Sequence, residues 1–292
     1  MGEGRVTLVG QAAGVTEIDP AARIARCAPG TTIGELVEAA GERGLAVPLG
    51  TVGDDPIHLD GRDWLSRRYG TTGDNLATAA VPTDSATLAD APAGVDEIAM
   101  PVARTVPRHP AGAGEPAGLA VALTLHPVPR AVQLGIVFVG RERVAEALVR
   151  GAELIADWPD ELTGGLSCRA APSSPFVPPE YQLLSGLALV IVGLGDQRVH
   201  GAACAAAAEA LDPLFRAVLP ISYPALHALL GPPPDVTSRS ARLQRSSLDA
   251  VAERAATRSR HDRIELFPHA GGWAAEIAGE PHWVATTARE WR

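Results

Sequence analysis

Residues 48–76 read PLGTVGDDPIHLDGRDWLSRRYGTTGDNL, and the first half of this stretch is unusually acidic for a glycine-containing loop. Four carboxylates lie close together there: Asp54, Asp55, Asp60 and Asp63. Loops that bind phosphate do so through backbone N–H groups, which bulky or anionic side chains obstruct. A carboxylate about 4 Å from a phosphate costs on the order of 4 kcal/mol at an effective dielectric constant of about 20. The acidic half therefore disfavours a phosphate-bearing ligand.

The composition around this stretch is that of a globular chain, with 46% hydrophobic and 20% charged residues among 292. A chain of this length forms one large domain or two packed lobes. The net charge of −9 argues against a surface that tracks nucleic-acid phosphates. All 25 basic residues are arginine, so Schiff-base and lysine-base chemistry are excluded.

Cysteine usage and hydropathy indicate the compartment. Cys27, Cys168 and Cys204 are odd in number and widely spaced, which matches neither a disulfide framework nor a CxxC metal pair. We see no signal-peptide pattern, and the longest apolar run, at 186–195, is too short to span a bilayer. We therefore expect a cytoplasmic protein with neither a membrane nor a nucleic acid as partner.

The hydrophobic pattern predicts an α+β chain of two lobes, residues 1–128 and 129–292. In the first lobe, Thr32 and Glu35 form a T-x-x-E capping box that starts a helix with one apolar face. In the second lobe, apolar strands alternate with helices, which predicts a large sheet covered by helices on one side. The strands are expected at 131–139, 160–170, 183–194 and 240–246, with a last strand pair at 263–277, and the helices at 141–156, 200–214, 222–230 and 246–258.

Three motifs of common enzyme classes are interpreted as structural. Ser167 lies in GLSCR, which lacks the second glycine of a hydrolase nucleophile elbow. The histidine-containing segments at 58–60 and 260–263 bring no third metal ligand at suitable spacing. The GLG at 193–195 precedes Asp196, which occupies the place where a phosphate would need room. We therefore expect no metal site and no phosphate-binding loop.

Six segments together resemble the berberine-bridge-enzyme-like branch of the FAD-linked oxidases, in the vanillyl-alcohol-oxidase superfamily. They occur in family order and cover most of the chain: VTEIDPAARIARCAPGTTIGELVEAAGERGLAVPLGTVG, WLSRRYGTTGDNL, LTLHPV, ADWPDELTGGL, PISYPALHALL and ELFPHAGGWAAEI. The resemblance implies a PCMH-type flavin-binding lobe and a substrate lobe whose antiparallel sheet roofs the isoalloxazine ring.

The chain departs from the family pattern where the family holds its cofactor. The glycine-rich loop before WLSRRYG has become DDPIHLDGRD, and a second glycine cluster has become RHPAGAGEPAG. We also expect the N-terminal strand with its histidyl flavin link, and the C-terminal Asn-Tyr motif, to be absent. We therefore interpret the flavin-binding lobe as degenerate and expect no cofactor. FAD is the expected cofactor only under the alternative function, an FAD-dependent oxidoreductase.

The resemblance and these departures predict a cofactor-independent cyclase of the [4+2] or ring-rearranging type, acting on a polyketide-like intermediate in natural-product biosynthesis. Such an enzyme folds its substrate in a hydrophobic chamber, and its rate acceleration comes mainly from orienting the reacting groups. Two alternatives stay open: an FAD-dependent oxidoreductase with non-covalent flavin, and a non-catalytic binding pseudoenzyme. The expected partner is a hydrophobic small molecule, and a homodimer is left open.

The resemblance implies that the strands at 240–246 and 263–273 belong to the sheet that roofs this chamber, and residues two apart on a strand share one face. The predicted catalytic residues are Gln244, Glu265 and His269. The predicted substrate-binding residues are Arg242, Phe267, Trp273, Tyr223 and His227, the last two being one helical turn apart. Two alternatives stay open: a solvent-facing pair on an edge strand for Glu265 and His269, and helix-to-sheet packing for Tyr223 and His227.

Overall fold

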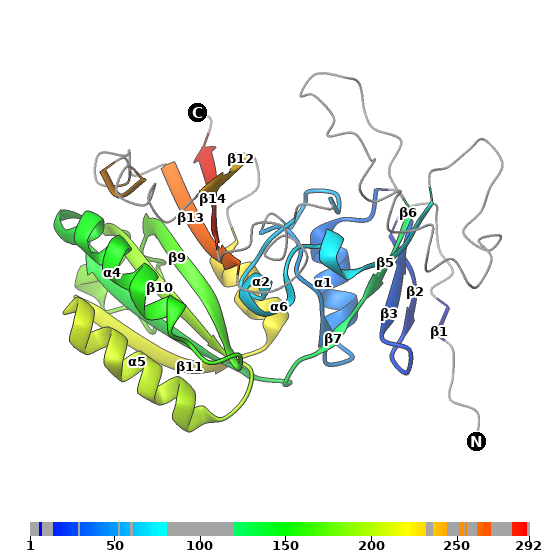
Figure 1. The fold of residues 1–292 in the computed structure, drawn as a ribbon, viewed down its shortest axis with the longest axis horizontal. Coiled ribbons are helices and arrows are strands. Elements are labelled where there is room, and N and C mark those ends of the chain that lie inside the picture. Colours follow the sequence, from blue (N-terminus) through cyan, green and yellow to red (C-terminus); the bar gives the residue numbers. More distant parts are fainter. Residues whose placement is uncertain are drawn as a thin grey trace.

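The protein has two lobes that lie side by side, each built around an antiparallel sheet, in a computed structural model (Figure 1). The structure describes residues 6–7, 14–28, 30–51, 53–58, 61–80, 120–231, 236–243, 251–253, 255, 262–269 and 282–290. The α+β class predicted from the sequence is confirmed. The predicted lobe boundary at 128/129 falls in the connection between β7 (His126–Pro127) and β8 (Val132–Gly140).

The first lobe contains a five-stranded sheet in the order β1-β2-β3-β6-β5 and a two-stranded sheet of β4 and β7. The strands are β1 (Val6–Thr7), β2 (Val15–Asp19), β3 (Ile24–Cys27), β4 (Leu45–Ala46), β5 (Leu76–Ala80) and β6 (Ala120–Thr124). The described residues of this lobe form the helix α1 (Ile33–Gly41) and the single turn α2 (Ser66–Tyr69).

Helix α1 forms where the capping box predicted it. The Thr32 hydroxyl accepts a hydrogen bond from the backbone N–H of Glu35, and the Glu35 carboxylate accepts one from the N–H of Thr32 at 2.8 Å. Reciprocal bonds of this kind satisfy two helix-start donors that would otherwise have no partner. The buried face consists of Ile33, Leu36, Val37 and Ala40.

The second lobe contains a seven-stranded sheet in the order β11-β8-β10-β9-β13-β14-β12. Its remaining strands are β9 (Leu162–Ala170), β10 (Ser185–Gly193), β11 (Phe215–Ile221), β12 (Val236–Leu243), β13 (Asp262–His269) and β14 (His282–Glu290). Its helices are α4 (Val144–Ala156), α5 (Gln197–Leu211) and α6 (Tyr223–Leu230).

Two of these strands differ from the prediction. Strand β11 was not predicted from the sequence, although its buried and exposed residues alternate as they do in a half-covered strand. The predicted last strand pair at 263–277 begins as β13, but the partner of β13 is β14, which lies farther along the chain and separates β13 from β12. Residues 270–281, and most of the helix expected at 246–258, lie outside the described part of the chain.

Helices α4 and α5 cover one face of the large sheet, as predicted (Figure 1). Leu148 and Ile155 of α4 pack there on Leu166 and Ile191 of the sheet. Helix α5 lies close to the sheet at Gly135. A Cβ atom at that position would overlap the Sγ atom of Cys204, so the absence of a side chain there makes room for the helix.

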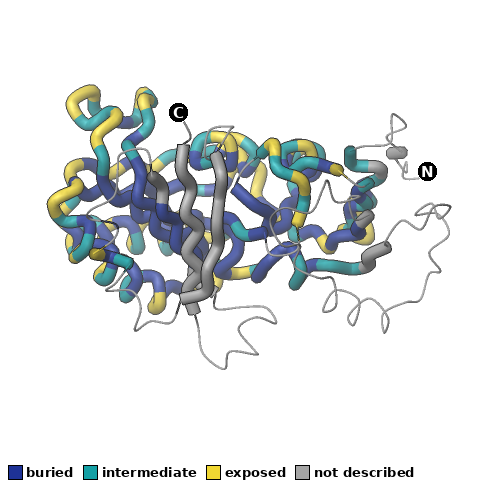
Figure 2. The backbone as a smooth tube through the Cα atoms, turned by 90° about the horizontal axis from the view of Figure 1, so that it is seen from above, coloured by how far each residue is buried: buried dark blue, intermediate teal, exposed yellow. Residues whose placement is uncertain are grey.

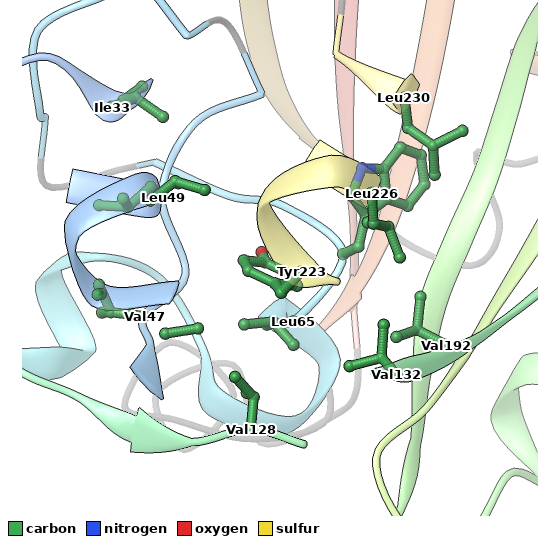
Figure 3. Packing of buried hydrophobic residues seen from close by; sticks show 14 of the residues in the cluster. Ile33, Val47, Leu49, Leu65, Val128, Val132, Val192, Tyr223, Leu226 and Leu230 are labelled. Atoms are coloured by element: carbon green, nitrogen blue, oxygen red, sulfur yellow. The ribbon is translucent and has the colours of Figure 1, made fainter. Parts of the chain in front are cut away.

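The other face of the sheet packs against the first lobe, and both lobes share one hydrophobic core there. Figure 2 shows buried segments in both lobes, and Figure 3 shows Tyr223 of α6 lying among Leu49 and Leu65 of the first lobe and Val132 of the second. The open apolar chamber expected on this face stays a prediction, and the described apolar side chains there pack into the shared core.

Candidate active site

The candidate site lies where α6, the loop after Leu49 and strand β13 meet. Glu265 and Phe267 of β13 share a face, as alternation predicted, and are 3% and 1% exposed. The Phe267 ring contacts the edge of the Trp64 ring, with centroids 5.1 Å apart and planes at 68°. A buried carboxyl group and a buried aromatic pair thus face the first lobe.

The Glu265 carboxyl group is bonded across the lobe junction. The hydroxyl of Thr51, in the first lobe, donates a hydrogen bond to its Oε2 atom at 3.3 Å. Within the sheet, Glu265 stands opposite Ser167, so the two residues share a face. The Ser167 Oγ and Trp64 Nε1 atoms are buried with no hydrogen-bond partner among the described residues. Such atoms are rare in proteins, and they mark the junction as a place where another polar group can be bonded.

Tyr223, at the start of α6, donates a hydrogen bond from its hydroxyl to Asp63 Oδ2 at 2.7 Å. Asp63 is fully buried and also accepts the backbone N–H groups of Leu49 and Leu65, each at 2.9 Å. Burial raises the pKa of Asp63 to about 7, and it raises the pKa of Tyr223 well above its usual value. The pair joins the two lobes.

This result corrects one premise of the sequence analysis. Asp63 does not project into a phosphate site, because its carboxyl group is enclosed by donors of its own chain. Of the other three carboxylates, Asp54 is exposed, Asp55 is half-buried with a pKa raised by burial, and Asp60 lies outside the described residues.

His227 lies one turn after Tyr223 on α6 and is 5% exposed. Its Nε2 atom is 2.8 Å from the backbone oxygen of Gly50, so Nε2 carries a proton and donates it. Burial lowers the pKa of His227, which favours the neutral ring with an unprotonated Nδ1 atom. The geometry leaves Nδ1 as a hydrogen-bond acceptor and a potential base.

A cavity of about 230 Å³ opens between α1, the loop at 51–54 and α6. Its lining residues are Gly34, Val37, Glu38, Thr51, Gly53, Asp54, Pro224, His227, Ala228 and Gly231. Thr51 and His227 are buried at its base, whereas Glu38 and Asp54 are exposed at its mouth. The cavity therefore reaches the groups that join the two lobes.

Two buried arginines donate to backbone oxygens near this junction, Arg67 across the lobes and Arg169 within the second lobe. The guanidinium of Arg67 donates to the backbone oxygens of Trp158, Pro159 and Leu162 in the second lobe. Arg169 of β9 donates to the oxygen of Leu230 at 2.9 Å and thereby caps the C-terminus of α6. The position of Arg169 within the apolar strand β9 was a signal in the sequence that its guanidinium bonds to other groups of the chain, because buried arginines are almost always paired.

The other predicted site residues are only partly placed. Gln244 and Trp273 lie outside the described residues. For Arg242 and His269 the structure gives the strand position: Arg242 is in register with Val284, and His269 with His282. Their predicted roles stay predictions. Thr51 and Asp63 were missed as site residues, because the loop carrying them was interpreted only as a former phosphate site.

The cavity at this junction is too small for FAD. The cavity is smaller than the roughly 300–1,000 Å³ of common ligand sites, and FAD is larger than most of their ligands. The backbone N–H groups of Ile33 and Gly34 at the start of α1 donate to the oxygens of Asp55 and Gly53, so they are not available to a phosphate. Across the described chain, no group of three His, Cys, Asp or Glu side chains is placed to hold a metal ion.

The two lobes and their topology define a class: the chain has the two-lobed fold of the berberine-bridge-enzyme-like FAD-linked oxidases. In particular, it is similar to berberine bridge enzyme from Eschscholzia californica, with 18% identity, a TM-score of 0.63, and coverage of 94% of this chain and 59% of that one. It is also similar to 6-hydroxy-D-nicotine oxidase from Arthrobacter nicotinovorans, with 17% identity, a TM-score of 0.61, and coverage of 94% and 63%.

A berberine-bridge-enzyme-like protein from Arabidopsis thaliana matches at 17% identity and a TM-score of 0.64, with coverage of 94% of this chain and 61% of that one. The chain thus spans about three fifths of the length of the structures it resembles. No protein-family model and no curated protein matches the sequence. The predicted resemblance is confirmed at the level of the fold.

Proposed function

We propose that this chain is a flavin-independent cyclase or isomerase that acts on a small organic molecule held between its lobes. One observation carries the proposal: Thr51 and His227, from opposite lobes, line the same cavity, and Thr51 is bonded to the buried Glu265 carboxyl group. Acid–base catalysis needs proton donors and acceptors held within hydrogen-bond reach of a bound substrate.

Each of these residues has a distinct role in the proposal. His227 acts through its Nδ1 atom as the base that accepts a proton from the substrate. The Thr51 hydroxyl passes a proton between the Glu265 carboxyl group and a substrate atom in the cavity. Burial excludes water from both groups, which strengthens their interactions with the substrate. No electron transfer is required, in agreement with a cavity too small for FAD.

The size of the cavity limits the substrate. A polyketide-like intermediate enters by one end only, because the cavity measures about 230 Å³. Holding that end beside His227 and Thr51 would favour one folded conformer of the remainder, and orientation of this kind can supply much of the rate of a ring closure. We therefore keep a polyketide-like intermediate as the proposed substrate class, with only one end of the molecule bound in the cavity.

The test uses His227→Gln and Thr51→Val, with Thr163→Val as matched control. Thr163 is also a buried threonine bonded across the junction, to the Trp64 backbone oxygen at 2.7 Å, but it does not line the cavity. Purified proteins are incubated with linear polyketide thioesters, with and without added FAD, and products of unchanged mass are quantified. We expect His227→Gln to lower turnover by about 100-fold or more, and Thr163→Val to retain it.

Two outcomes would overturn the proposal. Purified protein that carries the visible absorbance of stoichiometric flavin, and needs it for turnover, would support the FAD-dependent oxidoreductase. Tight binding of a thioester without any product would support a binding protein without catalysis.

A further inference from the structure

The cavity between α1 and α6 has a one-sided hydrogen-bonding character. Four of its lining residues have polar side chains: Glu38, Thr51, Asp54 and His227. Carboxylates only accept hydrogen bonds, and a neutral imidazole accepts at whichever ring nitrogen lacks the proton. The character of the site therefore depends on how Thr51 and His227 use their own protons.

Both residues already donate to other groups of the chain. The Thr51 hydroxyl donates its only proton to Glu265, and the oxygen lone pairs remain. The His227 ring donates from Nε2 to the Gly50 oxygen, which leaves Nδ1 as the acceptor nitrogen of the neutral ring. All four polar side chains of the cavity thus act as acceptors.

Two backbone N–H groups of the cavity wall are already bonded within the chain. The N–H of Gly34 donates to Gly53, and the N–H of Gly231 donates to His227, so both are used within the chain. No arginine is among the described residues that line the cavity, and Glu38 and Asp54, the carboxylates among them, stand at the mouth. An anionic ligand would meet two like charges, whereas a ligand with several N–H donors and a positive charge matches every group.

We propose that this cavity binds the protonated amine of a small organic cation, with its N–H groups directed to Thr51 and His227 and its charge facing Glu38 and Asp54. The inference rests on the proposed function in one respect, since it names the chemical class of the substrate end that enters the cavity. An ammonium group has three donors, so it can satisfy the two buried acceptors and one carboxylate at the same time.

Three probes of similar size and different charge test the inference: butylammonium, neutral pentanol and anionic pentanoate. Each is titrated at low salt into the full chain labelled with ¹⁵N, and backbone amide shifts at the lining residues are followed by NMR. We expect saturable shifts with butylammonium and none with pentanoate. Glu38→Gln and Asp54→Asn should each weaken butylammonium binding by about 2- to 5-fold, and added salt should weaken it further.

The control variant is Glu209→Gln on the exposed side of α5, which removes the same charge far from the cavity. Its affinity for butylammonium should equal that of the wild type. The inference is wrong if pentanol or pentanoate binds as well as butylammonium, if Glu209→Gln weakens binding as much as Glu38→Gln, or if no lining residue shifts. If butylammonium does not bind but His227→Gln still lowers turnover, the cation-binding inference is wrong and the proposed function stands. If butylammonium binds but the protein turns over no substrate, the proposed function is wrong and the cation-binding inference stands.

Discussion

Asp63 provides the sharpest test of how the two lobes are joined. Its carboxyl group is fully buried between Tyr223 and the N–H groups of Leu49 and Leu65, and its pKa is raised from 3.8 to about 7. The unfolded chain therefore releases this proton near pH 4, while the folded chain keeps it until about pH 7. This group stabilises the fold fully at low pH, and its contribution is lost as the pH rises from about 4 through 7.

The size of the effect follows from the shift. About three pKa units correspond to roughly 4 kcal/mol of stability lost between the two limits, at about 1.4 kcal/mol per unit. Between pH 5 and pH 8 the loss is on the order of 3 kcal/mol. Asp63→Asn cannot ionise, so its stability relative to the wild type should improve by that amount over the same interval. The variant also carries a constant penalty, because an amide cannot accept from all three donors.

Urea unfolding at pH 5 and pH 8 measures this difference. Tyr223→Phe is the control, because it removes one hydrogen bond and leaves Asp63 ionisable. It should cost about 1–3 kcal/mol and keep the wild-type direction of pH dependence. The reasoning would be refuted if the stability of Asp63→Asn relative to the wild type stayed constant with pH, or if it fell between pH 5 and pH 8.

Three further predictions concern stability and reactivity. Arg67→Met removes the donors to three backbone oxygens of the other lobe and should lower the free energy of unfolding in urea by about 3 kcal/mol, whereas the exposed Arg68→Met should change it by less than about 0.5 kcal/mol. Gly201→Ala places a methyl group in open space on α5 and should stabilise the protein by up to about 1 kcal/mol; Gly165→Ala overlaps a backbone oxygen of β13 and should destabilise it in the same assay. Burial raises the pKa of Cys204 to about 11, so this thiol should react with iodoacetamide only after unfolding, and modification of the folded protein at neutral pH would contradict its placement.

The sequence predicted the parts of the fold that depend on local patterns. Thr32 and Glu35 fixed the start of α1, and apolar runs fixed β8 and β10. The shared face of Glu265 and Phe267 followed from the two-residue repeat of a strand. These features depend on neighbours within a few residues, which a sequence displays directly.

The candidate site depended on contacts between distant segments and could be predicted only in part. Glu265, Tyr223 and His227 were predicted as site residues, and the structure places them at the lobe junction, but their catalytic and binding roles stay predictions. Their partners Thr51 and Asp63 were not predicted. Thr51 and Glu265 are 214 positions apart, and no local pattern relates them. The acidic loop was interpreted from the sequence as a segment that disfavours a phosphate-bearing ligand. In the structure the same loop contributes Asp63 to the buried core.

Sequence alone determined that this chain combines α and β elements and carries four carboxylates at Asp54, Asp55, Asp60 and Asp63, because composition and periodicity are properties of single segments. Tertiary structure decided what those carboxylates do. Packing of α6 between the sheets buries Asp63 as an acceptor, leaves Asp54 at the mouth of a cavity, and turns His227 and Thr51 toward each other's lobe. The physical reason is that burial and hydrogen-bond partners, which set the charge and reactivity of a side chain, exist only after distant segments have packed together.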